Sequence, residues 1–387
     1  MTPRLRAGVP EVAAMLRTAL LFCAFLAGVM LAATPPPAVA AAVPVRWETM
    51  LLPVSIDGRA YRLDALLLYP DDGRAHPLAV VSHGSPRSAS DRPGLSPASN
   101  AEQMLWFARR GWSVVAVLRR GYGRSEGGWA ETYGSCADPD YVGAGLRGAA
   151  DIAATIRALA NDPHVDASRV LAVGVSAGAF ATVALTSAPP PGLAGAIAFA
   201  PGRGSPGADQ VCAQDRLVAA FAAFGRTSRV PILWISAPND HFFGPTLVRR
   251  SVAAFDGAGG RATFFATPPY GSEGHYLFGA TDAIPMWEAA ASTFFVKNGL
   301  ELVAQPLDLA GETEPAPRAL GPKGRVAFAR YGLEPPHKAF ALSPDGSYGF
   351  AYGARSTQVA AQRALAACPK TAHENCAIVD REGSAVR

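Results

Sequence analysis

The residue best placed for nucleophilic chemistry is a serine between an aliphatic run and an Ala-rich segment. It lies in Gly174-Val-Ser176-Ala-Gly178, after the aliphatic residues 170–173. This order predicts a strand, a sharp turn carrying Ser176, and a helix, with glycines where side chains would collide with neighbouring backbone. The start of the helix leaves unpaired N–H groups beside the serine, where an oxyanion is stabilised. Ser176 is therefore the candidate nucleophile.

A second copy of the same five-residue pattern occurs earlier, as Gly123-Arg-Ser125-Glu-Gly127. The residues that follow it, Gly-Trp-Ala-Glu-Thr, do not begin a helix. Without a helix after the turn, this copy lacks the context that exposes a nucleophile. We assign Ser125 to a loop.

A serine hydroxyl reacts only when a base takes its proton and a carboxylate orients that base. Asp240 follows a predicted strand at 231–236, and His275 follows another at 262–267. The chain order Ser, Asp, His, with each residue after a strand, is the order expected on a parallel sheet with a nucleophilic turn. The sequence predicts a catalytic triad of Ser176, Asp240 and His275.

Each triad position has alternatives. Glu273 or Asp282 would be the acid if Asp240 served only to cap the next helix. His83 and His241 are rival bases, although neither follows the strand whose loop is expected to carry the base. Ser176 itself would be only a turn residue if the scaffold were inactive.

The rest of the chain alternates between strand-like and helix-like segments, which predicts a mostly parallel sheet of about eight strands with helices on both faces. The carboxyl ends of parallel strands share one edge, where ligands bind, and the candidate residues all fall there. The predicted strands are 47–56, 61–69, 78–82, 112–118, 169–175, 193–200, 230–236 and 262–267; the predicted helices are 99–110, 141–161, 177–185, 212–224, 246–255 and 284–298.

With these residues in place, the chain resembles the α/β-hydrolase fold. Within it, the chain is similar to secreted members near the dienelactone hydrolase and prolyl oligopeptidase-type catalytic domains. The matching stretches are His83-Gly-Ser-Pro86, Arg120-Gly-Tyr-Gly-Arg-Ser125, Gly174-Val-Ser-Ala-Gly178, Asn239-Asp240 and Gly274-His275. The nucleophile is Ser rather than the Cys of dienelactone hydrolase, and no propeller domain precedes it, which puts peptide specificity in doubt.

The resemblance implies an oxyanion hole made by the backbone N–H groups of Ser85 and Ala177. Candidate pocket residues are His83, Tyr122, Phe242 and Tyr276, each of which has core packing as its alternative role. Arg119, Arg120 and Arg124 have two open roles, the structural one usual in this fold and recognition of an anion. Only about thirty residues separate the predicted strand 193–200 from the predicted strand 230–236, which leads to Asp240. This segment is too short for a large lid, so we expect an open cleft.

The N-terminal residues 1–40 have the features of a secretory signal peptide. Three arginines precede an apolar run at 18–33, and small residues follow at a cleavage site ending at Ala40. Met15 is an alternative start, and a retained membrane anchor is the alternative role. Removal of this leader leaves a net charge of about +2 from the formal +4, which gives no support for nucleic-acid binding. We expect a secreted or periplasmic protein with no stable membrane span after cleavage.

Four cysteines remain after cleavage, and an even number in an exported protein suggests two disulfides. Regional pairing favours Cys136–Cys212 and Cys368–Cys376. The chain has no Cys-x-x-Cys and no His-Glu-x-x-His, so we expect no metal and no cofactor.

We therefore expect a catalytic domain at 45–300, a Pro/Glu-rich linker at 301–324 and a small α+β module at 325–387. The module resembles small cysteine-bearing domains of secreted bacterial proteins. It has two open roles, that of a passive appendage and that of a segment that contacts the cell envelope. The predicted function is that of an exported serine hydrolase that cleaves a carboxylic ester, a small molecule, through an acyl-enzyme. The alternatives are a peptidase or amidase of prolyl oligopeptidase type that acts on short peptides, and an inactive envelope-binding protein.

Overall fold

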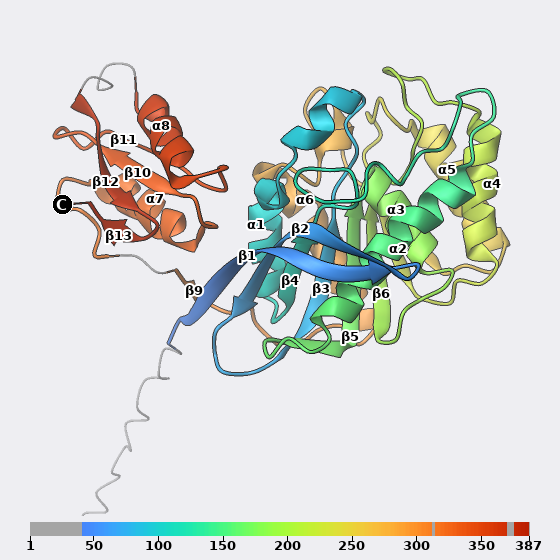
Figure 1. The fold of residues 1–387 in the computed structure, drawn as a ribbon, viewed down its shortest axis with the longest axis horizontal. Coiled ribbons are helices and arrows are strands. Elements are labelled where there is room, and N and C mark those ends of the chain that lie inside the picture. Colours follow the sequence, from blue (N-terminus) through green and yellow to red (C-terminus); the bar gives the residue numbers. More distant parts are fainter. Residues whose placement is uncertain (1–40, 312–313, 370–374, 387) are drawn as a thin grey trace, which may run out of the picture. The chain divides into compact units, whose positions relative to one another are not determined.

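A nine-stranded sheet organises the larger part of the protein (Figure 1), in a computed structural model that describes residues 41–311, 314–369 and 375–386. The predicted signal peptide lies outside the described residues. Within the described ranges, none of the helices is both long enough and apolar enough to cross a bilayer.

The sheet has the order β8-β7-β6-β5-β3-β4-β2-β1-β9. Six neighbouring strands of the sheet pair in parallel: β8, β7, β6, β5, β3 and β4. The hairpin β1–β2 joins this group through the antiparallel pairing of β2 with β4. The prediction of a mostly parallel sheet is confirmed. The strands are β1 (Val43–Ile56), β2 (Arg59–Pro70), β3 (His76–Ser82), β4 (Ser113–Val117), β5 (Val165–Val175), β6 (Leu193–Phe199), β7 (Ile232–Ser236), β8 (Ala262–Ala266) and β9 (Leu309–Ala310).

Helices cover both faces of this sheet (Figure 1), because its central strands are apolar on both sides. In β3, Leu78 and Val80 face one core, whereas Ala79 and Val81 face the other. Helices α2 to α5 contribute to the first core, and α1 and α6 to the second. The helices are α1 (Ala101–Ala108), α2 (Tyr141–Leu159), α3 (Ala177–Leu185), α4 (Gln214–Gly225), α5 (Pro245–Gly257) and α6 (Ile284–Lys297), with 3-10 turns at Ala89–Gly94, Pro97–Asn100, Gly274–Tyr276 and Thr281–Ala283.

The segment predicted to be a linker, 301–324, differs from expectation in two places. β9 pairs with the start of β1, and Leu309 is buried in a core of the large sheet. Helix α7 (Pro322–Leu333) begins inside the predicted linker. Its first residue is Pro322, and proline suits this position because the N–H it lacks has no helical partner there. The proline content of this segment predicted a linker, but the segment also contains a short strand and the start of a helix.

The small module contains a four-stranded antiparallel sheet of order β11-β10-β12-β13. Along β10, Ala339 and Ala341 pack with α8, whereas Phe340 and Leu342 pack with α7. A disulfide joins Cys368, at the end of α8, to Cys376. The remaining elements are β10 (Ala339–Leu342), β11 (Tyr348–Ala351), α8 (Thr357–Ala367), β12 (Ala377–Arg381) and β13 (Ser384–Ala385).

Candidate active site

Ser176 occupies a strained turn between β5 and α3, which we call the elbow. Its backbone has φ 56° and ψ −121°, a conformation that costs free energy and persists only when the surroundings hold it. The Ser176 N–H donates to the carbonyl of Phe199 at 2.9 Å, and the Ser176 carbonyl accepts from the N–H of Phe180 at 2.9 Å. Its Oγ makes no hydrogen bond with any described residue, and 8% of Ser176 is exposed. The elbow thus presents a hydroxyl with no structural task.

The two glycines of the elbow are required by close backbone approach. A Cβ on Gly174 would lie 2.6 Å from the N atom of Ala179, and one on Gly178 would lie 2.2 Å from the carbonyl oxygen of Ser82. Neither glycine has a positive φ. Contact between β3, β5 and α3, rather than turn geometry, therefore fixes their type.

Asp240 and His275 meet at the carboxyl edge of the sheet. Asp240 follows β7, and its Oδ2 lies 3.0 Å from His275 Nδ1, while its Oδ1 accepts the N–H groups of Phe242 at 2.7 Å and Phe243 at 2.9 Å. The ring of Phe242 stacks on the imidazole at 3.9 Å between centroids. Both carboxylate oxygens are engaged. Because Asp240 contacts Nδ1, Nε2 is the nitrogen of His275 that has no hydrogen-bond partner among the described residues.

Ser176 and His275 line one cavity, and Gly84 lines it with them. A Cβ on Gly84 would lie 3.2 Å from Ser176 Cβ, so the turn 83–85 passes directly over the nucleophile. Among the described residues, no hydrogen bond joins Ser176 Oγ to His275. Catalytic hydrogen bonds are often long in the absence of substrate and shorten when it binds.

The rival histidines have other partners. The Nδ1 of His83 lies 2.6 Å from the carbonyl oxygen of Gly84, and its Nε2 accepts the N–H of Arg119 at 3.1 Å. Burial, followed by the charge of Arg119, lowers the pKa of His83 to about 3. His241 is paired with Asp209 at 3.0 Å, a hydrogen bond that raises its pKa. Both ring nitrogens of His83 are thus engaged, and His241 is not among the residues that line the cavity of Ser176 and His275.

The rival carboxylates are also engaged elsewhere. Glu273 Oε1 accepts the N–H groups of His241 and His275, each at 3.0 Å, and so ties together the loops after β7 and β8. Asp282 accepts the hydroxyl of Tyr270 at 2.8 Å. Asp240 is the carboxylate that contacts the imidazole of His275.

The turn His83-Gly84-Ser85, here called the oxyanion turn after the role expected from the sequence, lies against Ser176. The His83 ring holds the Gly84 carbonyl, and in a trans peptide the following N–H, that of Ser85, points the opposite way. Within the described chain, the N–H groups of Ser85 and Ala177 donate to no protein acceptor. Both residues line a small cavity together with Ser176.

A buried charge network supports the oxyanion turn from below. The fully buried Arg119 donates to the carbonyl of His83 and to Ser82 Oγ, both at 2.8 Å, and pairs with Glu131. Arg203 also pairs with Glu131. Burial alone would raise the pKa of Glu131, but Arg119 and Arg203 outweigh it and lower the pKa to about 2.

The other two arginines of the loop are also structural. Arg120 pairs with the buried Asp151 at 2.7 Å, and Arg124 pairs with Asp64 at 2.6 Å. Together with the Arg119 contacts, these pairs support the structural role of the loop and not anion recognition by it.

The four candidate pocket residues fall into two groups. His83, Phe242 and Tyr276 line the cavity that holds Ser176 and His275, and Tyr276 is 60% exposed at its rim. Tyr122 is 0% exposed and lies behind the oxyanion turn, where its hydroxyl donates to Ser85 Oγ at 2.9 Å and accepts from Trp129 Nε1 at 3.0 Å. Tyr122 therefore contacts Ser85 and does not line the cavity. Its hydroxyl belongs to a buried group of hydrogen bonds with Ser85 and Trp129.

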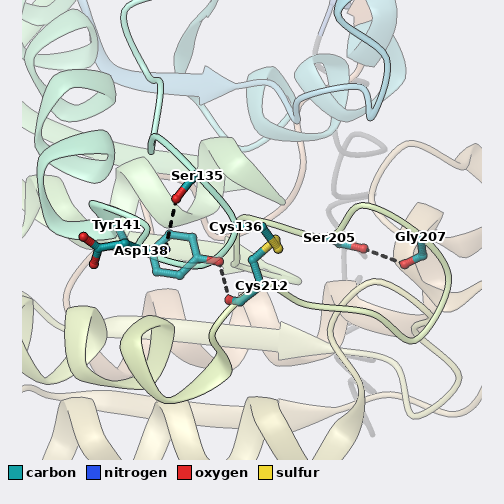
Figure 2. Close-up of a disulfide and its surroundings, with 7 residues drawn as sticks. All are labelled: Ser135, Cys136, Asp138, Tyr141, Ser205, Gly207 and Cys212. Atoms are coloured by element: carbon teal, nitrogen blue, oxygen red, sulfur yellow. Dashed lines mark hydrogen bonds between the residues drawn. A yellow bond between two sulfur atoms is a disulfide. The ribbon is translucent and has the colours of Figure 1, made fainter.

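A disulfide joins Cys136 to Cys212 and connects the loop after β4 with the loop after β6 (Figure 2). Beside it, the hydroxyl of Tyr141 donates to the carbonyl of Cys212 at 2.6 Å. Ser205 Oγ donates to the carbonyl of Gly207 in the same loop. The two regional pairings favoured from the sequence are the ones present.

Sequence reasoning missed Glu131, Arg203 and Arg92. Arg203 follows β6 and so met the strand-end criterion that selected Asp240, but a lone Arg between glycines carries no motif. Glu131 lies in an irregular loop and Arg92 in the short 3-10 turn Ala89–Gly94, and in neither case does sequence spacing predict position.

A scan against family models matches residues 57–243 to the model described as X-Pro dipeptidyl-peptidase (S15 family). A search of curated proteins found no match. Among solved structures, the esterase Pf2001 of Pyrococcus furiosus is 14% identical with a TM-score of 0.45, covering 65% of this chain and 92% of that one. Esterase 2 of Thermogutta terrifontis is 18% identical with a TM-score of 0.47, covering 66% and 96%. Dipeptidyl peptidase 4 of Porphyromonas gingivalis has the same identity and TM-score, covering 66% and 36%.

The matched region includes both the elbow and Asp240. Read with the parallel sheet and the strand–elbow–helix unit, the family match identifies the chain as a serine hydrolase of the α/β-hydrolase fold, of esterase or peptidase type.

Proposed function

We propose that the protein is an exported hydrolase that cleaves a carboxylic ester through an acyl-enzyme on Ser176. The observation that carries the proposal is the contact of 3.0 Å between Asp240 Oδ2 and His275 Nδ1 beside an elbow serine whose hydroxyl has no other task. A nucleophile, a base and an orienting group in one cavity are the minimum set for acyl transfer.

In the proposed reaction, His275 Nε2 takes the proton of Ser176 as its Oγ attacks the ester carbonyl carbon. Asp240 stabilises the imidazolium that forms. The protonated imidazole then gives the proton to the leaving alcohol, and the acyl-enzyme remains. Water, activated by the same imidazole, hydrolyses the acyl-enzyme and restores Ser176.

The negative charge that develops on the carbonyl oxygen would be received by the N–H groups of Ser85 and Ala177. Both are free of protein acceptors among the described residues, and Ala177 is the first residue of α3, where the helix dipole favours an anion. Tyr122 would act as a positioning residue, because its hydroxyl fixes the side chain of Ser85.

Export rests on the predicted leader and on the two disulfides, since disulfides persist in oxidising compartments. N-terminal sequencing of the mature protein from a bacterial periplasm or culture medium would test it, with cleavage after Ala40 as the expected result. We further propose that the small module contacts the cell envelope. Deletion of residues 322–387, which removes α7 as a whole, should then release activity from the envelope fraction without abolishing ester hydrolysis.

Labelling with a fluorophosphonate probe tests the triad. We expect the probe to modify Ser176, as located by peptide mass spectrometry, and to leave Ser176→Ala unlabelled. Ser125→Ala is a matched control, since it removes the same hydroxyl from the other copy of the pattern, and it should be labelled as the wild type is. Labelling of Ser176→Ala at another serine would overturn the assignment.

The second candidate function is that of a peptidase, which the match to the dipeptidyl-peptidase family model favours. The two candidates differ in the leaving group, so kcat/KM for 4-nitrophenyl butyrate should be compared with that for aminoacyl-proline 4-nitroanilides. A higher value for the esters supports the esterase. Faster cleavage of the proline anilides would establish the peptidase.

A further inference from the structure

Two cavities of different size and charge meet at Ser176. The larger, about 1150 Å³, contains His275 and is the cavity described above. The smaller, about 220 Å³, lies between the oxyanion turn and the loops after β4 and β6, and it includes Ala177. The two share Ser85, Pro86, Arg87, Ser176 and Phe242 in their walls. The nucleophile therefore lies at the junction between them.

The position of the base assigns the two cavities to the two halves of a substrate. His275 must deliver its proton to the leaving group, so the leaving group has to lie on the side where His275 lies. His275 lines the large cavity only. The small cavity, which holds an oxyanion donor but not the base, is then the place for the acyl chain.

The walls of the small cavity are cationic. Arg87, Arg92 and Arg203 line it, and no Asp or Glu is among its described lining residues. Two of these side chains have other contacts: Arg87 donates to the carbonyl and hydroxyl oxygens of Ser205, and Arg203 pairs with Glu131. The large cavity also contains Arg87, but there the carboxylates of Asp91, Glu273 and Asp282 line the same space, whereas Arg92 and Arg203 line the small cavity only.

Of the three arginines that line the small cavity, Arg92 has no ion-pair partner among the described residues. Its guanidinium stacks on Trp129 at 3.5 Å from the ring centroid, and its side chain makes no ion pair or hydrogen bond with any described residue. Its Nε is buried and unpaired. The stacking holds the planar group in place and leaves its N–H donors for a ligand.

The charge behind the cavity is also unbalanced. Arg119 and Arg203 are both buried, Arg203 being 4% exposed, and they share the single carboxylate of Glu131. Arg203 Nε has no hydrogen-bond partner. One positive charge is therefore left uncompensated in a region of low dielectric, where it attracts an anion more strongly than it would in water.

We propose that the small cavity is an acyl subsite for substrates whose acyl chain ends in a carboxylate, with Arg92 as the residue that pairs with it. This inference rests on the proposed ester hydrolysis. At about 30 Å³ per non-hydrogen atom, the cavity holds about seven such atoms, which is the size of a short dicarboxylic half-ester chain. The disulfide Cys136–Cys212 (Figure 2) joins the two loops that carry Trp129 and Arg203. Both of these residues line the small cavity.

A matched pair of esters tests the subsite. The 4-nitrophenyl monoester of adipic acid carries a terminal carboxylate, and the corresponding ester of adipamic acid carries a neutral carboxamide of the same size. We expect wild-type kcat/KM to be about tenfold higher for the anionic ester, and this ratio to fall about tenfold in Arg92→Gln and to shrink with added salt. Arg249→Gln, which removes an exposed arginine of α5, is the control and should keep the wild-type ratio.

Equal rates on the two esters, or an unchanged ratio in Arg92→Gln, would overturn the subsite while leaving ester hydrolysis established. If neither ester were hydrolysed, the proposed function would fail first, and direct binding would decide the subsite. Calorimetry with Ser176→Ala should detect adipate binding that weakens about tenfold when Arg92→Gln is added. Absence of adipate binding would refute the anion subsite irrespective of catalysis.

Discussion

The two copies of the Gly-x-Ser-x-Gly pattern fold into different structures. Around Ser176 the backbone leaves a strand, turns sharply and enters a helix, and the hydroxyl is left unbonded. Around Ser125 the chain is an irregular loop, and the hydroxyl is fully used: Oγ accepts the N–H of Asp64 at 2.8 Å and donates to the carbonyl of Leu118 at 2.6 Å. The hydroxyl of Ser176 is available for chemistry. The hydroxyl of Ser125 links β2 to the residue that follows β4.

Glycine is required for different reasons in the two copies of the pattern. Gly123 and Gly127 have φ of 54° and 92°, so a left-handed backbone calls for glycine there. Gly174 and Gly178 have ordinary backbone angles and are needed because other backbone lies against them. An identical pattern thus arises from turn geometry in one place and from close packing in the other.

Removing the nucleophile should have the largest effect. In Ser176→Ala we expect kcat/KM for a 4-nitrophenyl ester to fall by about 10⁴-fold or more, because the remaining donors stabilise charge but supply no covalent route. The melting temperature should not fall, since Ser176 Oγ bonds to no described residue and its removal leaves nothing unpaired. Residual activity within tenfold of the wild type would contradict the role of Ser176.

Removing the charge of Asp240 should have the next largest effect. Asp240→Asn preserves the shape of the side chain but favours the wrong imidazole tautomer, and we expect kcat to fall by about 10³- to 10⁴-fold. Asp282→Asn is the matched control, because Asp282 contacts Tyr270 and not the imidazole. A loss in the control as large as that in Asp240→Asn would show that the acid has been misassigned.

The elbow was predictable because each of its features is local. The aliphatic run, the two glycines and the Ala-rich helix are contiguous in the sequence, and their periodicity specifies the element types. Asp240 and His275 were found by counting strands, which works because the carboxyl ends of parallel strands share an edge. Tyr122, by contrast, was expected in the pocket, and only the tertiary contact with Ser85 shows where its hydroxyl points.

The support beneath the site was not predictable. Arg119 and Glu131 lie in the loop after β4 and Arg203 in the loop after β6, and nothing in their spacing brings them together. The strand β9 was missed for a related reason: two residues are too short for a periodic signal, and their place depends on where β1 begins. Long-range pairing of irregular segments is a property of the folded chain, which sequence patterns do not record.

Alanine at one glycine of each copy should separate their roles. Gly178→Ala places a Cβ 2.2 Å from the backbone of Ser82, which cannot move without shifting β3, and we expect a loss of about 3 kcal/mol or more in the free energy of unfolding. Gly123→Ala meets the flexible side chain of Leu118 and costs about 1–2 kcal/mol for its left-handed backbone. Equal losses in urea unfolding would contradict the distinction.

Acid should weaken the charge network beneath the oxyanion turn. The pKa of Glu131 is about 2 in the folded protein and near the ordinary 4.5 in the unfolded chain, so its contribution is present above about pH 4.5 and lost as the pH falls toward 2. At pH 7, Glu131→Gln should be less stable than the wild type. As the pH falls from about 4.5 toward 2, the variant should lose less free energy of unfolding than the wild type does. Glu126→Gln, which breaks an exposed pair with Arg62 in the other copy, is the control and should follow the wild type closely.

The smallest effect expected is that of Ser125→Ala, and it runs opposite to that of Ser176→Ala. Without Oγ, the N–H of Asp64 and the carbonyl of Leu118 each lose a partner in a partly buried region, at a cost of about 1–2 kcal/mol. The melting temperature should fall by about 2–4 °C, while kcat for a 4-nitrophenyl ester should stay within about twofold of the wild type. A large loss of kcat with an unchanged melting temperature would mean that the first copy takes part in catalysis, and the division between the two serines would not hold.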